Sequence, residues 1–244
     1  NIDELGANEE NRAVMMDYQG DGLWKYTMEL PASAKKFHYE YLVKSGEGIR
    51  REWGSPHSFS PGRNDGEYRL VDRWRDVPAD MPFYSSAFIQ GIFFRQHADS
   101  VVETIEPGTL TVKVDASQLR PDEMLVMVGD CPELGDWDVL KAPLLNDSAF
   151  PEWQITLDGK HLKFPFEYKF VIVRTHQREV VAWETGENRI CREKPQNPSE
   201  AVVVSGLRFN GFESRWKGAG TAIPVFSLRT DYGFGIGEFI DLKY

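Results

Sequence analysis

The stretch TLTVKVDA, at Thr109–Ala116, alternates apolar and polar residues with a period of two, which is the pattern of a strand with one buried face. Further apolar runs follow it, each bounded by Pro, Gly, Asp or Asn. They read EMLVMVGD, EWQITLDG, FPFEYKFVIV, VVAWE and AVVVSGLRF, in that order. Short strands separated by turn residues at this spacing predict an all-β fold, built as an antiparallel sandwich or barrel.

Composition supports a packed protein and limits its partners. Of the 244 residues, 41% are hydrophobic and 13% aromatic, which is enough to build a core. The 38 acidic residues outnumber the 28 basic ones and give a formal net charge of −10. Because nucleic-acid affinity depends on Lys and Arg that neutralise phosphates, we expect no nucleic-acid partner. No run approaches the roughly 18 apolar residues of a membrane span, so we expect no membrane partner either.

Cysteine and histidine show no pattern typical of a metal or cofactor site. Cys131 and Cys191 are the only cysteines, too few for a disulfide scaffold, and two free thiols are favoured over a single bridge. The five histidines lack a spacing in which several ligands would converge on zinc. We therefore expect no metal and no cofactor.

The sequence contains an internal repeat. Shifting the chain by 129 positions lays ELG at Glu4–Gly6 on ELG at Glu133–Gly135. The same shift, with one inserted residue before the last pair, aligns Trp24 with Trp153, Thr27 with Thr156, Phe37 with Phe166, Tyr39 with Tyr168, and Trp53 with Trp183. Because tryptophan is rare, chance is a poor explanation for two such pairs. We predict two copies of one β module in tandem.

The two copies differ at their starts. The second copy has two predicted strands, between Thr109 and Gly129, before its ELG motif, and the first copy has no counterpart to them. A module without these strands would expose unpaired backbone and an uncovered core. We therefore expect the natural chain to continue upstream of Asn1.

Four motifs of the second copy resemble, in order and spacing, those of family 20 carbohydrate-binding modules, the starch-binding domains. They are VGDCPELGDWD, PEWQITL, FEYKFVIV and VAWETGENRI, and the resemblance spans roughly residues 108–200. It implies an immunoglobulin-like β-sandwich that binds α-1,4-glucans such as starch, glycogen or maltooligosaccharides. Tryptophan suits this ligand, because an indole ring offers a rigid apolar face that stacks on the C–H face of glucose.

The resemblance also implies particular sugar-binding residues. Trp137 and Trp183 would be the stacking pair, and Lys169, Glu184 and Asn188 would hold the sugar hydroxyls. The sequence pattern alone does not decide the role of Lys169, because a solvated lysine on a strand would show the same pattern. Trp137 follows a turn-forming Gly-Asp and is flanked by aspartates, so we expect it at the surface. A shallow site of this kind should bind short glucans at about 10 µM to 1 mM.

Two further tryptophans and a tyrosine are interpreted differently. Trp153 lies in an alternating strand and is expected in the core. In the first copy, Trp53 is interpreted as a sugar-binding residue, as is Tyr18 beside the turn QGDG. The first copy has other residues where the second has its predicted ligands, namely Asn8, Glu40 and Ser58. We expect the first copy to bind glucan weakly, differently or not at all.

The C-terminal stretch WKGAGTAIPVFSLRTDYGFGIGEFIDLKY resembles the opening of the TIM barrel in amylomaltase-type 4-α-glucanotransferases of glycoside hydrolase family 77. The resemblance implies a parent transglycosylase whose barrel is a partner within the same chain. Its chemistry needs two carboxylates, which in that family lie well beyond Tyr244. We therefore expect no catalytic residue in this chain. The family and the low cysteine count favour a cytoplasmic location.

These observations divide the chain into four parts. We expect a first starch-binding-like module at 1–78 without its N-terminal strands, a connector at 79–107, a second module at 108–205, and a linker with the barrel opening at 206–244. The connector contains FIQGIFF, which is too apolar for a free linker. We expect it to pack against a module and to hold the two modules in a fixed orientation.

Taken together, the sequence favours a non-catalytic, glucan-binding N-terminal region of a 4-α-glucanotransferase. The alternative is a structural or protein-interaction spacer that binds no sugar, which suits the first module best because most of its sugar ligands are replaced. A regulatory glycogen sensor is a third reading, and the barrel-like C-terminus counts against it.

Overall fold

The computed structural model describes residues 2–7, 9–30, 36–46, 48–54, 56–62, 66–75, 104–117 and 119–210. Strands dominate these residues, and the helical elements among them are three single 3-10 turns, at Asp3–Leu5 (η1), Glu10–Arg12 (η2) and Pro132–Leu134 (η3). The prediction of an all-β fold is confirmed. The FIQGIFF segment and the predicted barrel opening lie outside the described residues.

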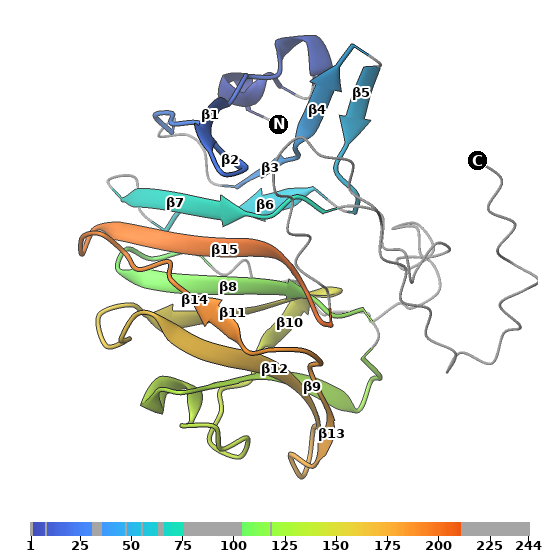
Figure 1. Cartoon of the computed structure of the whole chain (residues 1–244), viewed down its shortest axis with the longest axis vertical. Helices are drawn as coiled ribbons and strands as arrows, with labels where there is room; N and C mark the ends of the chain where they lie inside the picture. Colours follow the sequence, from blue (N-terminus) through green and yellow to red (C-terminus); the bar gives the residue numbers. More distant parts are fainter. Residues whose placement is uncertain are drawn as a thin grey trace, which may run out of the picture.

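Two sheets face each other across the core of the C-terminal half (Figure 1). The first has the order β10 (Asn146–Ala149), β11 (Glu152–Asp158), β8 (Thr109–Asp115), β15 (Glu200–Arg208) and β7 (Glu67–Asp72). In the second, β12 (Phe166–Arg174) pairs with β9 (Glu123–Gly129) along one edge, and with β13 (Val180–Trp183) and β14 (Arg189–Cys191) along the other. Each of the strands that the sequence predicted in this half is present.

The core lies between these two sheets because alternate side chains of each strand point inward. On β12, the inward residues Phe166, Tyr168, Phe170 and Ile172 are all buried. Trp153 on β11 is fully buried, and its indole N–H donates to the carbonyl oxygen of Ala116 at 3.2 Å. The expectation that Trp153 is a core residue is therefore confirmed.

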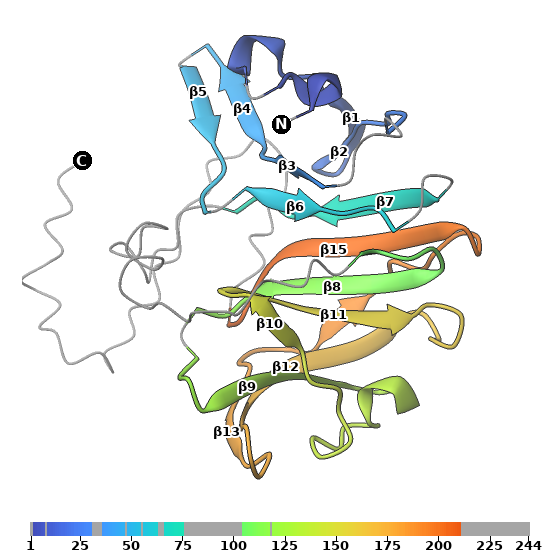
Figure 2. The same cartoon turned by 180° about the vertical axis from the view of Figure 1, so that it is seen from behind.

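Residues 2–75 are built differently. Their strands form three two-stranded sheets: β1 (Asp17–Gly20) with β2 (Leu23–Lys25), β3 (Phe37–Tyr39) with β6 (His57–Phe59), and β4 (Leu42–Ser45) with β5 (Gly48–Arg51). The remaining strand, β7, joins the sheet of the C-terminal half (Figures 1 and 2). The described part of the first copy thus makes no sandwich of its own, and a complete tandem module stays a prediction.

β15 joins the two halves of the molecule. It runs parallel to both of its neighbours, so that Val203 lies beside Leu70 of β7 on one side and Thr111 of β8 on the other. On the outer face of the sheet, Ala201 and Val203 pack against a group of buried residues from the N-terminal half and the end of the connector, namely Phe37, Phe59 and Ile105. The N-terminal half therefore covers the outer face of the five-stranded sheet.

A buried polar network lies at the same junction. Asp72 accepts hydrogen bonds from the hydroxyl groups of Tyr39 at 2.7 Å and Tyr41 at 2.8 Å, and from Ser205 of β15. His57 bridges Ser205 at 3.0 Å and the Glu52 carboxylate at 2.9 Å. Burial and the nearby Asp72 carboxylate raise the pKa of both tyrosines, so their hydroxyls stay protonated as donors. The network fixes the N-terminal half to β15 through directional contacts as well as apolar ones.

Glu52 shows how this network tolerates a buried charge. Burial alone would raise the pKa of its carboxyl. Hydrogen bonds from His57 and Arg75 outweigh that effect and hold the pKa below its ordinary value. Glu52 therefore remains ionised inside the junction.

The two cysteines are both free and both buried, as the sequence favoured. Burial raises the pKa of the Cys131 thiol to about 11 and raises that of Cys191. No helix among the described residues is long and apolar enough to cross a bilayer.

Asp115, at the end of β8, should make stability depend on pH. Burial raises the pKa of its carboxyl from 3.8 to about 6, so the native state holds this proton more tightly than the unfolded chain does. Ionisation then destabilises the fold as the pH rises from about 4 to about 6. We expect Asp115→Asn to raise the free energy of unfolding at pH 7 by about 1–3 kcal/mol, and to change it little at pH 4. Urea denaturation at the two pH values measures this difference, and an equal effect at both would contradict it.

Candidate functional site

The outer face of the β12 sheet carries most of the residues predicted to bind sugar. Since the even-numbered residues of β12 enter the core, Lys169 and Val171 face away from it. Partners directly opposite each other in a sheet share a face, and Val171 pairs with Trp183 of β13. Lys169 and Trp183 therefore lie on the same outer face. Trp183 is 42% exposed there, as a stacking platform requires.

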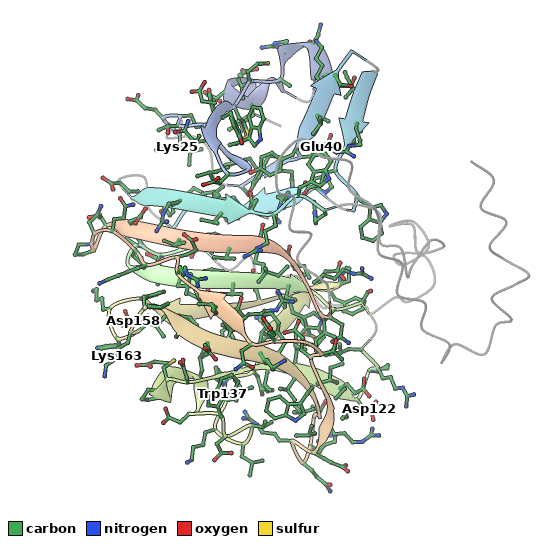
Figure 3. The ribbon with its side chains drawn as sticks, in the orientation of Figure 1. Lys25, Glu40, Asp122, Trp137, Asp158 and Lys163 are labelled. Carbon is green, nitrogen blue, oxygen red and sulfur yellow. The ribbon has the colours of Figure 1, made fainter. Side chains whose placement is uncertain are left out.

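Trp137 reaches this face from the opposite edge. Gly135, Asp136 and Trp137 all have positive φ angles, of 80°, 49° and 65°, and together make a sharp turn after η3. The backbone N–H of Trp137 donates to the carbonyl oxygen of Gly129, at the end of β9, at 2.8 Å. The half-buried ring packs against an outer-face cluster that includes Val128 and Val171. Figure 3 shows Trp137 well away from Lys25 and Glu40 of the N-terminal half.

The two tryptophans thus flank the central strand. Trp183 lies on one side of β12 and Trp137 beside β9 on the other. Neighbouring strands are about 4.8 Å apart, so the supporting backbones lie about 10 Å apart across the sheet. They are also offset along β12, because Trp183 pairs with Val171 whereas Gly129, which holds Trp137, pairs with Tyr168. Lys169 lies on the strand between them.

Lys169 is held by the loop that follows Trp183. Its ammonium group donates to the carbonyl oxygens of Glu184 at 3.1 Å and Gly186 at 2.7 Å. An ammonium group has three donors, and within the part of the chain that the structure describes these two carbonyls are its acceptors. One N–H of Lys169 is therefore free to reach a ligand hydroxyl. This arrangement favours the binding role over that of a freely solvated lysine.

Asn188 is exposed and is held by a residue that the sequence reasoning missed. Its side-chain N–H donates to the Glu167 carboxylate at 2.8 Å. Glu167 is exposed and lies two positions before Lys169, on the same face of β12. The amide oxygen of Asn188 and the Glu167 carboxylate are both polar groups at the surface near Lys169. The alternation of FEYKF could have identified Glu167, because it places Glu167 and Lys169 on the same face of the strand.

Glu184 is directed inward, contrary to the expectation that it holds sugar hydroxyls. The residue is only 5% exposed. Its carboxylate accepts from the Arg189 guanidinium at 2.9 Å and from the backbone N–H groups of Phe170 at 3.3 Å and Asn210 at 3.2 Å. These buried donors occupy the carboxylate. The main-chain oxygen of Glu184 contacts Lys169 instead.

The two sugar-binding residues predicted in the first copy belong to different strand pairs. Tyr18 on β1 is 55% exposed and faces Trp24 of β2, with ring centroids 5.1 Å apart and planes inclined by 49°. Trp53 follows β5, is half-buried, and donates its backbone N–H to the carbonyl oxygen of Arg75 at 2.9 Å. The structure does not bring Tyr18 and Trp53 onto one strand pair.

Comparison with known families identifies the part of the chain that carries the site. Residues 109–202 match the family model described as "Starch binding domain". These residues form a starch-binding domain of family 20. The matched range contains Trp137, Lys169, Trp183 and Asn188, and it excludes the N-terminal half.

The similarity to a curated protein extends beyond this domain. The chain is 30% identical over 217 residues to the 4-alpha-glucanotransferase DPE2 of Oryza sativa subsp. japonica. The match covers 83% of this chain and 22% of that protein. The chain therefore spans about a fifth of the length of this relative.

Solved structures also match part of this chain. The family 20 carbohydrate-binding module of a maltotetraose-forming amylase from Pseudomonas saccharophila STB07 is 19% identical and covers 38% of this chain and 98% of that chain, with a TM-score of 0.33. A γ-CGTase from alkalophilic Bacillus clarkii is 24% identical, with coverages of 42% and 15% and a TM-score of 0.33. A glucoamylase from Hormoconis resinae is 19% identical, with coverages of 46% and 18% and a TM-score of 0.35. Each likeness covers less than half of this chain.

Proposed function

We propose that the outer face of the β12 sheet binds α-1,4-glucan. The observation that carries the proposal is the placement of Trp183 and Trp137 on either side of Lys169, on a sheet face directed away from the core. The match of residues 109–202 to the starch-binding family supports the same ligand class. Starch, glycogen and maltooligosaccharides all present this linkage.

Binding would combine stacking with a few fixed hydrogen bonds. The two indole rings cover apolar faces of two glucose units, and aromatic rings lose little side-chain entropy when they bind. Between the rings, the free N–H of Lys169 donates to a sugar hydroxyl, and the amide oxygen of Asn188 accepts one. A site with so few contacts should have a dissociation constant of about 10 µM to 1 mM, or about −4 to −7 kcal/mol.

Calorimetric titration with β-cyclodextrin tests this function, because the ring presents the curved α-1,4 face without other chemistry. We expect Trp183→Ala to weaken binding at least tenfold, since central aromatic residues dominate such interfaces. Tyr26→Ala is the matched control, because Tyr26 is 40% exposed and lies outside the site. Binding by the control at wild-type affinity is the expected result. No binding of β-cyclodextrin by the folded wild-type chain at millimolar concentration would refute the proposal.

The wider role proposed for the chain is that of a glucan-holding region of a 4-α-glucanotransferase. The 30% identity to DPE2 supports it, as does the resemblance of the stretch WKGAGTAIPVFSLRTDYGFGIGEFIDLKY to the opening of a glucanotransferase barrel. A short connection between the binding site and a downstream barrel would raise the effective glucan concentration at the active site to the millimolar range. The glucanotransferase activity of the parent enzyme would then fall in the Trp183→Ala variant at low glucan concentration and recover at high glucan concentration.

The N-terminal half is proposed as a module of spacing and support. Its apolar side chains pack on the outer face of the five-stranded sheet, which favours a role within the molecule over a separate binding function. Tyr18 and Trp53 are proposed as weak sugar contacts at most. In the titration above, a Trp53→Ala variant that keeps wild-type affinity supports the spacing role.

A further inference from the structure

The loop between Trp183 and Arg189 is fastened to the end of β15, and this attachment suggests positioning residues for the proposed sugar site. We propose that Asn210, Glu184 and Arg189 position Trp183 and Lys169 for glucan binding without touching the ligand. The inference rests on the proposed function of the β12 face. It gives Glu184 a positioning role in place of the predicted contact with sugar. It also adds Arg189, which lies beneath the surface of the site, and Asn210, which follows β15.

Glu184 and Arg189 form the buried part of the attachment. Their side chains are 3% and 9% exposed, and the guanidinium binds both carboxylate oxygens. A second nitrogen of Arg189 donates to the carbonyl oxygen of Arg208 in β15, at 2.8 Å. The guanidinium also lies over the ring of Phe170, 5.5 Å from its centroid. Both ends of the loop are thereby tied to strands of opposite sheets.

Asn210 forms the second attachment. Its side-chain oxygen accepts from the backbone N–H of Thr185 at 2.8 Å and from the Thr185 hydroxyl at 3.1 Å. Its own backbone N–H donates to Glu184 at 3.2 Å. Asn210 has a φ of 57°, a left-handed conformation that asparagine adopts more readily than most residues. The side chain therefore points its oxygen at the loop from a fixed backbone position.

The attachment controls groups that face the ligand. Thr185 lies between Glu184 and Gly186, whose carbonyl oxygens hold the Lys169 ammonium at 3.1 Å and 2.7 Å. Trp183 immediately precedes the loop. If the loop moves away from Asn210, both carbonyl acceptors of Lys169 change position, and Trp183 loses its support. Fixed geometry of this kind raises affinity because less conformational freedom is lost on binding.

Two substitutions of Asn210 distinguish the effect of its side-chain hydrogen bonds from the effect of its backbone conformation. Asn210→Gly tolerates the positive φ but removes the acceptor oxygen, and Asn210→Asp keeps an acceptor and also tolerates this conformation. We expect Asn210→Gly to weaken β-cyclodextrin binding three- to tenfold and to speed amide hydrogen exchange at Thr185. We expect Asn210→Asp to restore both towards the wild-type values, while the thermal midpoints of the two variants stay similar.

The outcomes distinguish this inference from the function on which it rests. Wild-type affinity in Asn210→Gly, with faster exchange at Thr185, would overturn the positioning role and leave the glucan site standing. Unchanged exchange at Thr185 would overturn the attachment itself. Failure of the wild-type chain to bind β-cyclodextrin would overturn the proposed function, and the positioning role with it. Weaker binding that Asn210→Asp restores supports the inference, because a general loss of stability would not be repaired by an acceptor oxygen.

Discussion

Replacing Asp72 by alanine should lower the free energy of unfolding by about 3–5 kcal/mol. The Asp72 side chain is 1% exposed and accepts hydrogen bonds from Tyr39, Tyr41 and Ser205. Removing the carboxylate leaves three buried hydroxyl groups without this acceptor, and each unsatisfied buried donor costs about 1–3 kcal/mol. Because Ser205 belongs to β15, the loss also weakens the junction between the two halves.

Urea denaturation followed by both circular dichroism and tryptophan fluorescence measures this effect. In the wild-type chain we expect a single transition, because β7 and β15 share a sheet. Asp17→Ala is the control, since Asp17 is an acidic residue on an exposed strand, and we expect it to change stability by less than about 0.5 kcal/mol. A cost below about 1 kcal/mol for Asp72→Ala would show that the network contributes little to the junction.

The two tryptophans related by the repeat should respond very differently to truncation. Trp153 is fully buried and Trp24 is 55% exposed. Trp153→Ala removes a large core side chain together with its hydrogen bond to Ala116, and we expect a loss of about 3–5 kcal/mol. Trp24→Ala removes mainly the ring contact with Tyr18, and we expect a loss below about 1 kcal/mol.

Circular dichroism is the suitable probe for this pair, because each variant loses a fluorophore. Equal losses in the two variants would mean that Trp24 packs in solution as Trp153 does, and that the first copy holds a core of its own. A large loss for Trp153 alone supports a single main core, between the β12 sheet and the five-stranded sheet. The comparison thereby measures how far the two copies have diverged in packing.

Local patterns in the sequence were sufficient to predict the strands of the starch-binding domain. Alternation predicted β8 and β11, and apolar runs bounded by turn residues predicted β9 and β12, because both signals depend on neighbours only a few residues away. The same periodicity placed Trp153 in the core. Lys169 was predicted from the family resemblance alone, and the acceptors of its ammonium became visible only in three dimensions.

Contacts between distant residues explain what the sequence did not show. The parallel pairing of β7 with β15 joins segments whose contacts span 133 residues, as between Asp72 and Ser205. No local sequence pattern predicts a pairing between strands so far apart in the chain. Glu184 looked like a surface acid in a turn, but Arg189 and the backbone of Asn210, 26 residues away, draw its carboxylate inward. Burial of a charge is decided by its partners, and these came from other elements.

The position of β15 between β7 and β8 has a consequence for synthesis on the ribosome. Both neighbours of β15 are translated before it, and more than a hundred residues separate the appearance of β7 from that of β15. At typical elongation rates this delay is on the order of ten seconds. During that time β7 and β8 present facing edges with no strand between them, the kind of edge that invites pairing with another chain. Protection by chaperones should therefore matter most in this interval, before the last strand of the sheet emerges.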